Sequence, residues 1–230
     1  MLTFNFSKRA GLFAALLLFS LSGFSQEERI DALSVLKEGN KRFYAGQLLH
    51  EHQSLDRVKE LAGGQNPKAV IISCSDSRVT PEILFDQGLG DIFSIRTAGN
   101  VMSDYEEGSV EYAVEHLGTS LVVVMGHHGC GAVKAFLNYA EHKEEHEDHA
   151  EVASHINSII EKMSSEDEQK AVLEQPGDHY EKSIEANVIN GVNQLRKSDP
   201  ILAHLYKEGK VQIIGAIYHI ENGQVEFLDY

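Results

Sequence analysis

Residues 121–131 read LVVVMGHHGCG, an apolar and mostly β-branched run that ends in a glycine-rich turn with two histidines and one cysteine. LVVVM is the most strand-like run in the chain, and we expect a helix over the following residues, AVKAFLNYA. A second short apolar run, KAVIIS at 68–73, ends just before Cys74 and suits a strand that is buried on both faces. These units predict an α/β fold with a parallel core.

The flanking sequence continues this alternation of strands and helices. We expect a helix that starts at Thr80-Pro81 and ends at Gly88, and two strands near the C-terminus joined by an Asn222-Gly223 turn. Further helices are expected over 27–47, 109–117 and 181–197, and a further strand over 91–96. The fold class is therefore α/β, with a mostly parallel central sheet flanked by helices and a C-terminal antiparallel hairpin.

The N-terminal residues 1–25 have the parts of a secretory signal peptide. Lys8 and Arg9 precede the apolar run 10–21, and small residues follow it. We expect cleavage before Gln26, which leaves an exported protein, periplasmic or secreted, without a stable membrane anchor. A permanent N-terminal anchor is the alternative, although the run is short for a membrane span. The single domain is then 26–230, in which 141–178 is an acidic, histidine-rich insert and loop.

The composition excludes several classes of protein. The 230 residues include 35 acidic and 20 basic side chains, which give a formal net charge of −15. Such a surface repels phosphate backbones, so we expect no nucleic-acid partner. Two cysteines are too few for a four-cysteine zinc ribbon or a scaffold with several disulfides.

The segment 141–151, EHKEEHEDHAE, is a dense run of charges. Such runs are usually solvated surfaces. Because histidine and carboxylate groups are competent ligands, a weak metal-binding or proton-buffering patch is the alternative.

Cys74, His127 and Cys130 form the most informative constellation. Each follows the end of a predicted buried strand, and sites in parallel sheets gather beyond the carboxyl ends of strands. Two thiolates and one imidazole are a zinc-type ligand set, and three protein ligands leave a fourth position open, as in catalytic zinc sites. A disulfide between Cys74 and Cys130 is the alternative for an exported protein.

Asp76 and Arg78 lie two and four residues after Cys74. Asp76 is close enough in sequence to contact the metal or its bound water, and Arg78 would hold the aspartate ionised and oriented. An Asx-type turn with Arg78 as a surface partner of Asp76 is equally consistent with the spacing.

With these residues, the chain resembles the β-class carbonic anhydrases. The motifs Cys74-Ser75-Asp76-Ser77-Arg78 and Gly126-His127-x-x-Cys130-Gly131 carry the resemblance, together with RTAGN at 96–100 and SVEYA at 109–113. The family implies zinc held by Cys74, His127 and Cys130, with Asp76 as a further candidate ligand and an Asp76–Arg78 dyad. It also implies Gln65 as a catalytic donor and a carbon dioxide pocket at Phe93, Tyr112 and Gly131.

This resemblance implies reversible zinc-dependent hydration of carbon dioxide to bicarbonate, in a homodimer or homotetramer whose N-terminal helix embraces the partner. His128 departs from the pattern, because members typically have serine there; it is either a simple surface substitution or an ionisable group beside the metal. A hydrolase of carbon disulfide or carbonyl sulfide on the same zinc site is one alternative function. A non-enzymatic periplasmic zinc-binding protein is the other.

Overall fold

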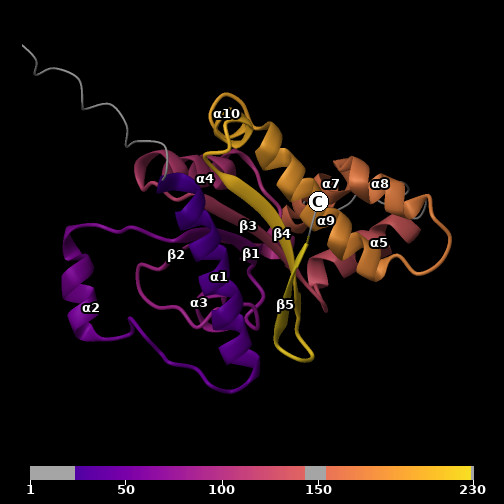
Figure 1. Ribbon diagram of the computed structural model, residues 1–230. Helices are drawn as coiled ribbons and strands as arrows, with labels where there is room; N and C mark the ends of the chain where they lie inside the picture. Colours follow the sequence, from indigo (N-terminus) through magenta and orange to yellow (C-terminus); the bar gives the residue numbers. More distant parts are fainter. Residues whose placement is uncertain (1–23, 143–153, 229–230) are drawn as a thin grey trace, which may run out of the picture.

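The computed structural model describes residues 24–142 and 154–228, and its centre is a five-stranded sheet (Figure 1). The strand order is β2-β1-β3-β4-β5. The first four strands run parallel to their neighbours, and β5 is antiparallel to β4. The predicted mostly parallel sheet with a C-terminal hairpin is therefore confirmed. The strands are β1 (Ala69–Cys74), β2 (Ile92–Thr97), β3 (Leu121–His127), β4 (Gln212–His219) and β5 (Gln224–Leu228).

Every residue of β1 and β3 is buried, which explains why both strands read as continuous apolar runs. Alternate side chains point to opposite faces of the sheet, so two separate core layers form. One layer lies under α1 and α3, and the other lies under the helices drawn on the opposite side of the sheet in Figure 1. The first pair is α1 (Phe24–Tyr44) and α3 (Pro81–Leu84); the opposite set includes α4 (Asp104–His116), α5 (Gly131–Glu141), α7 (His155–Ser165) and α9 (Tyr180–Lys197).

Two expected helices have different bounds. The helix that begins at Pro81 ends at Leu84 rather than at Gly88, because Asp86 takes a left-handed backbone conformation with φ of 47°. The helix expected from residue 109 starts earlier, at Asp104, where Ser103 and Glu106 form a capping box.

Several helices of the structure were not expected from the sequence. Within 141–178, which was expected to be an insert and loop, α7 and α8 (Asp167–Leu173) pack against α5 and α9. Residues 143–153 of the acidic segment lie outside the described residues. Short helices also occur as α2 (Leu55–Glu60) and α10 (Leu202–Lys207), with 3-10 turns η1 (Leu61–Gly63) and η2 (Ala98–Asn100).

Helix α1 is fixed to its own chain at Gly39 and Asn40. The side chain of Asn40 donates to the carbonyls of Leu84 and Gly223, at 3.0 Å each, and accepts from the Val225 N–H at 2.8 Å. A Cβ on Gly39 would lie 1.8 Å from the backbone oxygen of Phe85, so only glycine allows this approach. The end of α1 is therefore held between α3 and the C-terminal hairpin.

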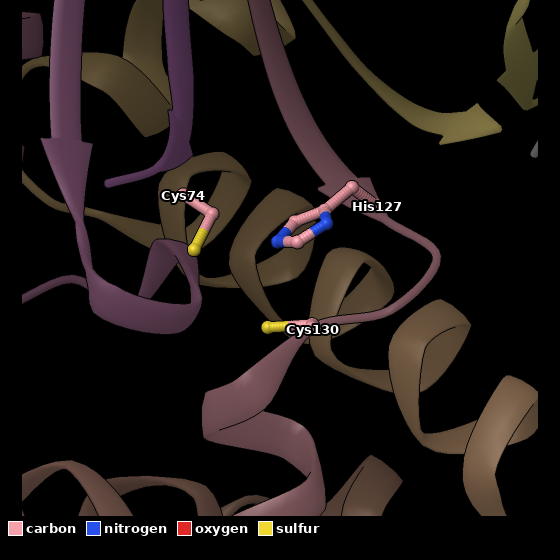
Figure 2. A group of neighbouring side chains, drawn as sticks. All are labelled: Cys74, His127 and Cys130. Carbon is pink, nitrogen blue, oxygen red and sulfur yellow. The ribbon is translucent and has the colours of Figure 1, made fainter. Parts of the chain in front are cut away.

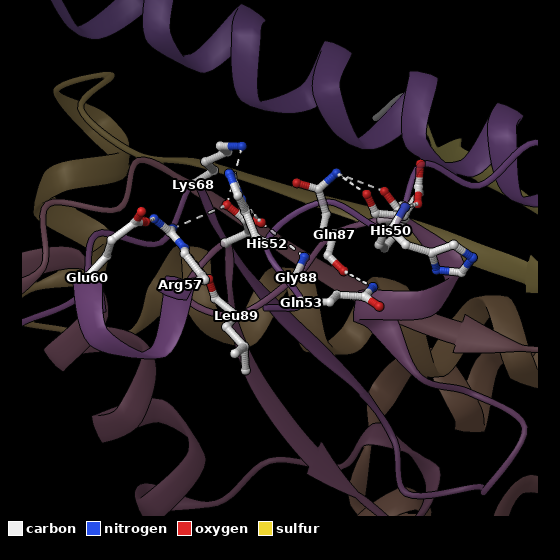
Figure 3. A network of polar contacts seen from close by, with 12 residues as sticks. His50, His52, Gln53, Arg57, Glu60, Lys68, Gln87, Gly88 and Leu89 are labelled. Carbon is white, nitrogen blue, oxygen red and sulfur yellow. Dashed lines mark hydrogen bonds and ion pairs between the residues drawn. The ribbon is translucent and has the colours of Figure 1, made fainter. Parts of the chain in front are cut away.

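Two buried aspartates, Asp86 and Asp91, organise the loops before β1 and β2. Figure 3 labels some of the residues around them, among them His50, His52, Lys68 and Gly88. Asp86 accepts from the Arg42 side chain at 2.6 Å and from the backbone of the 47–54 loop. Asp91 contacts His52 Nδ1 at 2.7 Å, the Gly88 N–H at 3.0 Å and Lys68 Nζ at 3.4 Å. Buried carboxylates need such partners, and these contacts fix the entry to both strands.

None of the helices in the described part of the chain is long and apolar enough to cross a membrane. The expected signal peptide lies almost wholly in residues 1–23, outside the described residues, and it stays a prediction.

Glu166, between α7 and α8, gives a stability prediction. Its carboxyl group is buried, Oε2 has no hydrogen-bond partner among the described residues, and burial raises the pKa of Glu166 from 4.5 to about 8. Between these two pH values the folded chain keeps a proton that the unfolded chain has released, so the free energy of unfolding falls as pH rises. Glu166→Gln should therefore stabilise the protein by ~2–5 kcal/mol at pH 8.5 and by far less at pH 4.5.

Urea unfolding at the two pH values measures this difference. The exposed Glu174→Gln in the loop after α8 is the matched control and should change neither value. An equal effect of Glu166→Gln at both pH values would contradict the proposed titration.

Candidate metal centre

Cys74, His127 and Cys130 converge at the carboxyl edge of the sheet, as Figure 2 shows. Cys74 is the last residue of β1, His127 is the last residue of β3, and Cys130 is the N-cap of α5. One ligand atom from each residue lies within 4.8 Å of the other two, and all three residues are buried. The parallel pairing of β1 with β3 brings the two strand ends together, and the 126–131 turn returns Cys130 to the same point.

The imidazole of His127 is oriented for metal binding. Its Nδ1 lies 2.9 Å from the carbonyl oxygen of His128, to which a protonated Nδ1 donates. Nε2 then carries the free lone pair, and it is buried without a hydrogen-bond partner among the described residues. A buried acceptor without a partner is costly, and a metal ion at this position would satisfy it.

Both cysteines are free in the structure, so the alternative of a disulfide is not what the chain adopts. The Cys130 thiol donates to Cys74 and, with the N–H groups of Gly99 and Asp76, lowers the pKa of Cys74 to about 4. The same hydrogen bond, and then burial, raise the pKa of Cys130. The fold therefore favours the thiolate form of Cys74, and a bound cation would also favour the thiolate form of Cys130.

Asp76 and Arg78 form a two-pronged ion pair beside this centre. Asp76 Oδ1 accepts from Arg78 Nε at 2.9 Å, and Oδ2 accepts from Nη2 at 2.7 Å. These hydrogen bonds hold the pKa of Asp76 well below its usual range. In this structure the carboxylate of Asp76 is therefore directed to Arg78, and the three-residue ligand group does not include it.

Three residues that sequence reasoning gave no role support the centre. Gly99 donates its N–H to Cys74 Sγ at 3.3 Å, Arg96 donates to the carbonyls of Cys74 and Asp76 at 3.2 and 2.8 Å, and the Tyr180 hydroxyl donates to the Cys130 carbonyl at 3.0 Å. Gly99 has φ of 69°, and a Cβ there would meet Ala132 at 2.7 Å. The RTAGN motif contained the signal for Gly99 and Arg96; no local pattern marked Tyr180.

The expected pocket residues are split between two places. Gly131 begins α5 directly after Cys130. Phe93 lies near the start of β2, in register with Val70, and its ring centroid is 6.3 Å from that of Tyr112 on α4. Gln65 precedes β1, whose six residues span roughly 17 Å. One chain therefore brings Asp76, Arg78 and Gly131 to the centre but leaves Gln65 at the opposite edge of the sheet.

The chain is similar to known carbonic anhydrases. The family model described as carbonic anhydrase matches residues 69–225. A carbonic anhydrase of Mycolicibacterium smegmatis is 42% identical over 201 residues, covering 86% of this chain and 92% of the relative. A β-carbonic anhydrase of Coccomyxa, solved with acetazolamide, superposes with a TM-score of 0.64 at 28% identity, covering 91% of this chain and 86% of that one.

A further solved structure, one of two tetrameric β-carbonic anhydrases from the ascomycete Sordaria macrospora, has a TM-score of 0.62 at 23% identity. It covers 89% of this chain and 98% of its own. At that identity the similarity concerns the fold.

Replacing either cysteine should remove tightly bound zinc. Cys74→Ser and Cys130→Ser each replace a soft, anionic ligand with a neutral hydroxyl, so we expect the zinc content to fall from about one per chain to near zero under stringent dialysis. Elemental analysis of the purified variants measures this. Ser73→Ala, at the buried neighbour of Cys74, is the control and should retain zinc. Retention of zinc by both cysteine variants would show that the ion is held elsewhere.

Proposed function

We propose that the Cys74–His127–Cys130 centre is the active site of this chain. The chain belongs to the β-class carbonic anhydrase family and catalyses the reversible hydration of carbon dioxide. The observation that carries this assignment is the convergence of two sulfur atoms with the partnerless, buried Nε2 of His127. The relatives described above are carbonic anhydrases, which favours this function over carbon disulfide hydrolysis or zinc storage.

The residues of this centre fit a zinc ion. β-Class carbonic anhydrases are zinc enzymes, and Cys74, His127 and Cys130 would hold the ion here with a ligand set that leaves one position open. When bound, zinc supplies the Lewis acidity that makes a hydroxide nucleophile available near neutral pH.

Asp76 has the proposed role of orienting the nucleophile. Its carboxylate is held ionised by Arg78, so it can accept a hydrogen bond from the attacking hydroxide and direct a lone pair at the carbon of carbon dioxide. Arg78 is itself fixed by a hydrogen bond from Nη2 to the Gly129 carbonyl at 3.3 Å, within the turn that carries Cys130. Asp76 is thus a catalytic residue in this proposal, and Arg78 is a positioning residue.

The position of Gln65 supports an oligomer whose site is completed by a partner. Within one chain Gln65 and Phe93 lie toward the amino ends of β1 and β2, away from Cys74, and Tyr112, whose ring is beside that of Phe93, is 49% exposed. A second copy that contributes these residues would supply Gln65 as a donor to the developing bicarbonate oxygen and the two rings as an apolar wall. We therefore infer a homodimer or a homotetramer; the Sordaria relatives are tetrameric.

The location of the protein is also part of the proposal. Residues 1–25 support export to the periplasm or beyond, followed by loss of the leader. The mature domain is then 26–230, and its reaction partners are carbon dioxide and bicarbonate.

Asp76→Asn tests the orienting role. The amide preserves size and leaves the three metal ligands in place, but it loses the charge that binds Arg78 and can present a donor where an acceptor is needed. We expect full zinc content and a fall in the hydration rate of about 10²-fold or more. Arg78→Ala should cause a similar fall because Asp76 loses its anchor.

Stopped-flow hydration assays with zinc analysis measure both effects. Asp56→Asn, which breaks the exposed Asp56–Lys59 pair on α2, is the control and should have the parent rate. Full activity of Asp76→Asn with one zinc bound would rule out the orienting role.

Mixed oligomers test whether Gln65 acts across the interface. Gln65→Ala should be slow because its sites lack the donor, and Cys74→Ser should be inactive because its sites lack zinc. In a mixed dimer, one site combines the intact ligands of the first chain with the intact Gln65 of the second. Mixed dimers, co-expressed and purified through a different affinity tag on each chain, should therefore have about half of the activity of the unmodified dimer. Mixed dimers no more active than the Gln65→Ala parent would place Gln65 outside the partner's site.

A further inference from the structure

A second cluster of metal-competent side chains lies beside the catalytic centre and shares no residue with it. It consists of His128, His219 and Glu221, whose candidate ligand atoms lie within 4.8 Å of one another. His128 directly follows β3, His219 is the last residue of β4, and Glu221 lies in the loop that joins β4 to β5. All three side chains are reachable from solvent: the histidines are about one quarter exposed and Glu221 is 56% exposed.

The distances within this cluster match those of a zinc site. Nδ1 of His128 lies 3.4 Å from Glu221 Oε1, and Nδ1 of His219 lies 3.5 Å from the same oxygen. A tetrahedral zinc ion with bonds of about 2.0–2.2 Å places neighbouring ligand atoms about 3.3–3.5 Å apart. The rings of the two histidines also meet edge to face, with centroids 4.3 Å apart.

The outer nitrogen of each imidazole is paired with a further carboxylate. Nε2 of His128 lies 3.0 Å from Glu181 Oε2 in the first turn of α9, and Nε2 of His219 lies 3.2 Å from Glu226 Oε2 on β5. Histidines that bind metals almost always donate their other N–H to a carboxylate or carbonyl, which fixes the tautomer and makes the ligand more basic. Both histidines of this cluster have that support.

This pairing places unneutralised acceptor atoms at the centre of the cluster. If each Nε2 carries the proton that its glutamate accepts, both Nδ1 atoms present lone pairs toward the Glu221 carboxylate. Three acceptors then face one another, with two more carboxylates behind them. A divalent cation satisfies all three acceptors at once, whereas protons would have to be placed on both rings separately.

The backbone around the cluster is also fixed. The His128 N–H donates to the Tyr218 carbonyl at 3.0 Å, and the His219 carbonyl accepts from Gly223 N–H at 2.8 Å, which closes the hairpin loop. Ligands on strand ends and a closed loop need little reorganisation to bind an ion.

We propose that His128, His219 and Glu221 form a second, surface site for a divalent zinc-type cation, with Glu181 and Glu226 orienting the two imidazoles. The donor set of two imidazole nitrogens and one carboxylate oxygen suits Zn²⁺ and leaves a position for water. Because this set lacks thiolates and is half open to solvent, the site binds zinc more weakly than the Cys74–His127–Cys130 centre.

Zinc titration of the full oligomeric protein tests the site. The parent protein for this test carries His142→Gln, His146→Gln and His149→Gln, so that the histidines of the acidic segment 141–151 do not add to the number of zinc ions bound. We expect two zinc ions per chain in this parent by equilibrium dialysis and elemental analysis, with one lost to a weak chelator. In Glu221→Gln and in His219→Gln the stoichiometry should fall to one, and the retained first zinc shows that the variant is folded.

Two further variants sharpen the result. Glu226→Gln keeps all three ligands and should weaken the second zinc by about 10-fold or more, the usual effect of losing an outer partner. His204→Gln on α10 removes a histidine that pairs with Glu208 at 3.3 Å but belongs to no three-ligand group in the described chain, so it should keep two zinc ions. Cobalt gives an independent readout, because only the first site produces thiolate charge-transfer absorption.

The proposal is overturned if the parent takes up a single zinc per chain. It is equally overturned if Glu221→Gln retains two with unchanged affinity. Should His219→Gln lose both ions through misfolding, the exposed loop variant Glu221→Gln decides the matter.

Discussion

The parallel hydrogen-bonded pairing of β1 with β3 is the constraint on which the rest of the molecule depends. It sets Ser73 beside Met125, so Cys74 and His127 emerge at the same edge of the sheet. Because both strands lie inside the sheet and are buried on both faces, helices must cover each side. The fold and the position of the metal centre therefore follow from one pairing.

Much of the fold could be predicted because buried parallel strands leave continuous apolar runs, and the ligands follow those runs directly. Helices α7 and α8 were not predicted, because the adjacent acidic segment indicated an insert and loop over 141–178. Yet Ile156, Ile159, Ile160 and Met163 recur at helical spacing within α7, so the signal was present and was overlooked. The end of α3 depended on the backbone at Asp86, which hydrogen bonds from the 47–54 loop fix.

The site was predictable in part for the same reason. Cys74, Asp76, Arg78, His127 and Cys130 are local to two strand ends, and the expected parallel sheet brings those two ends to the same edge. His219 and Glu221 lie some ninety residues from His128, and only the pairing of β3 with β4 makes them neighbours. Gln65 has a position in one chain that explains nothing by itself, because its proposed role requires a second copy.

The two free, buried cysteines have a consequence for how the protein matures. Without metal, a thiolate at Cys74 accepts a hydrogen bond from the Cys130 thiol, which is the pair of groups from which an oxidant makes a disulfide. With the export proposed above, the chain would meet oxidants on its way to its destination. Zinc that arrives first would shield both sulfurs, and an oxidant that arrives first would close the site. The order of these two events, rather than the stability of the fold, would then set the active fraction of the protein.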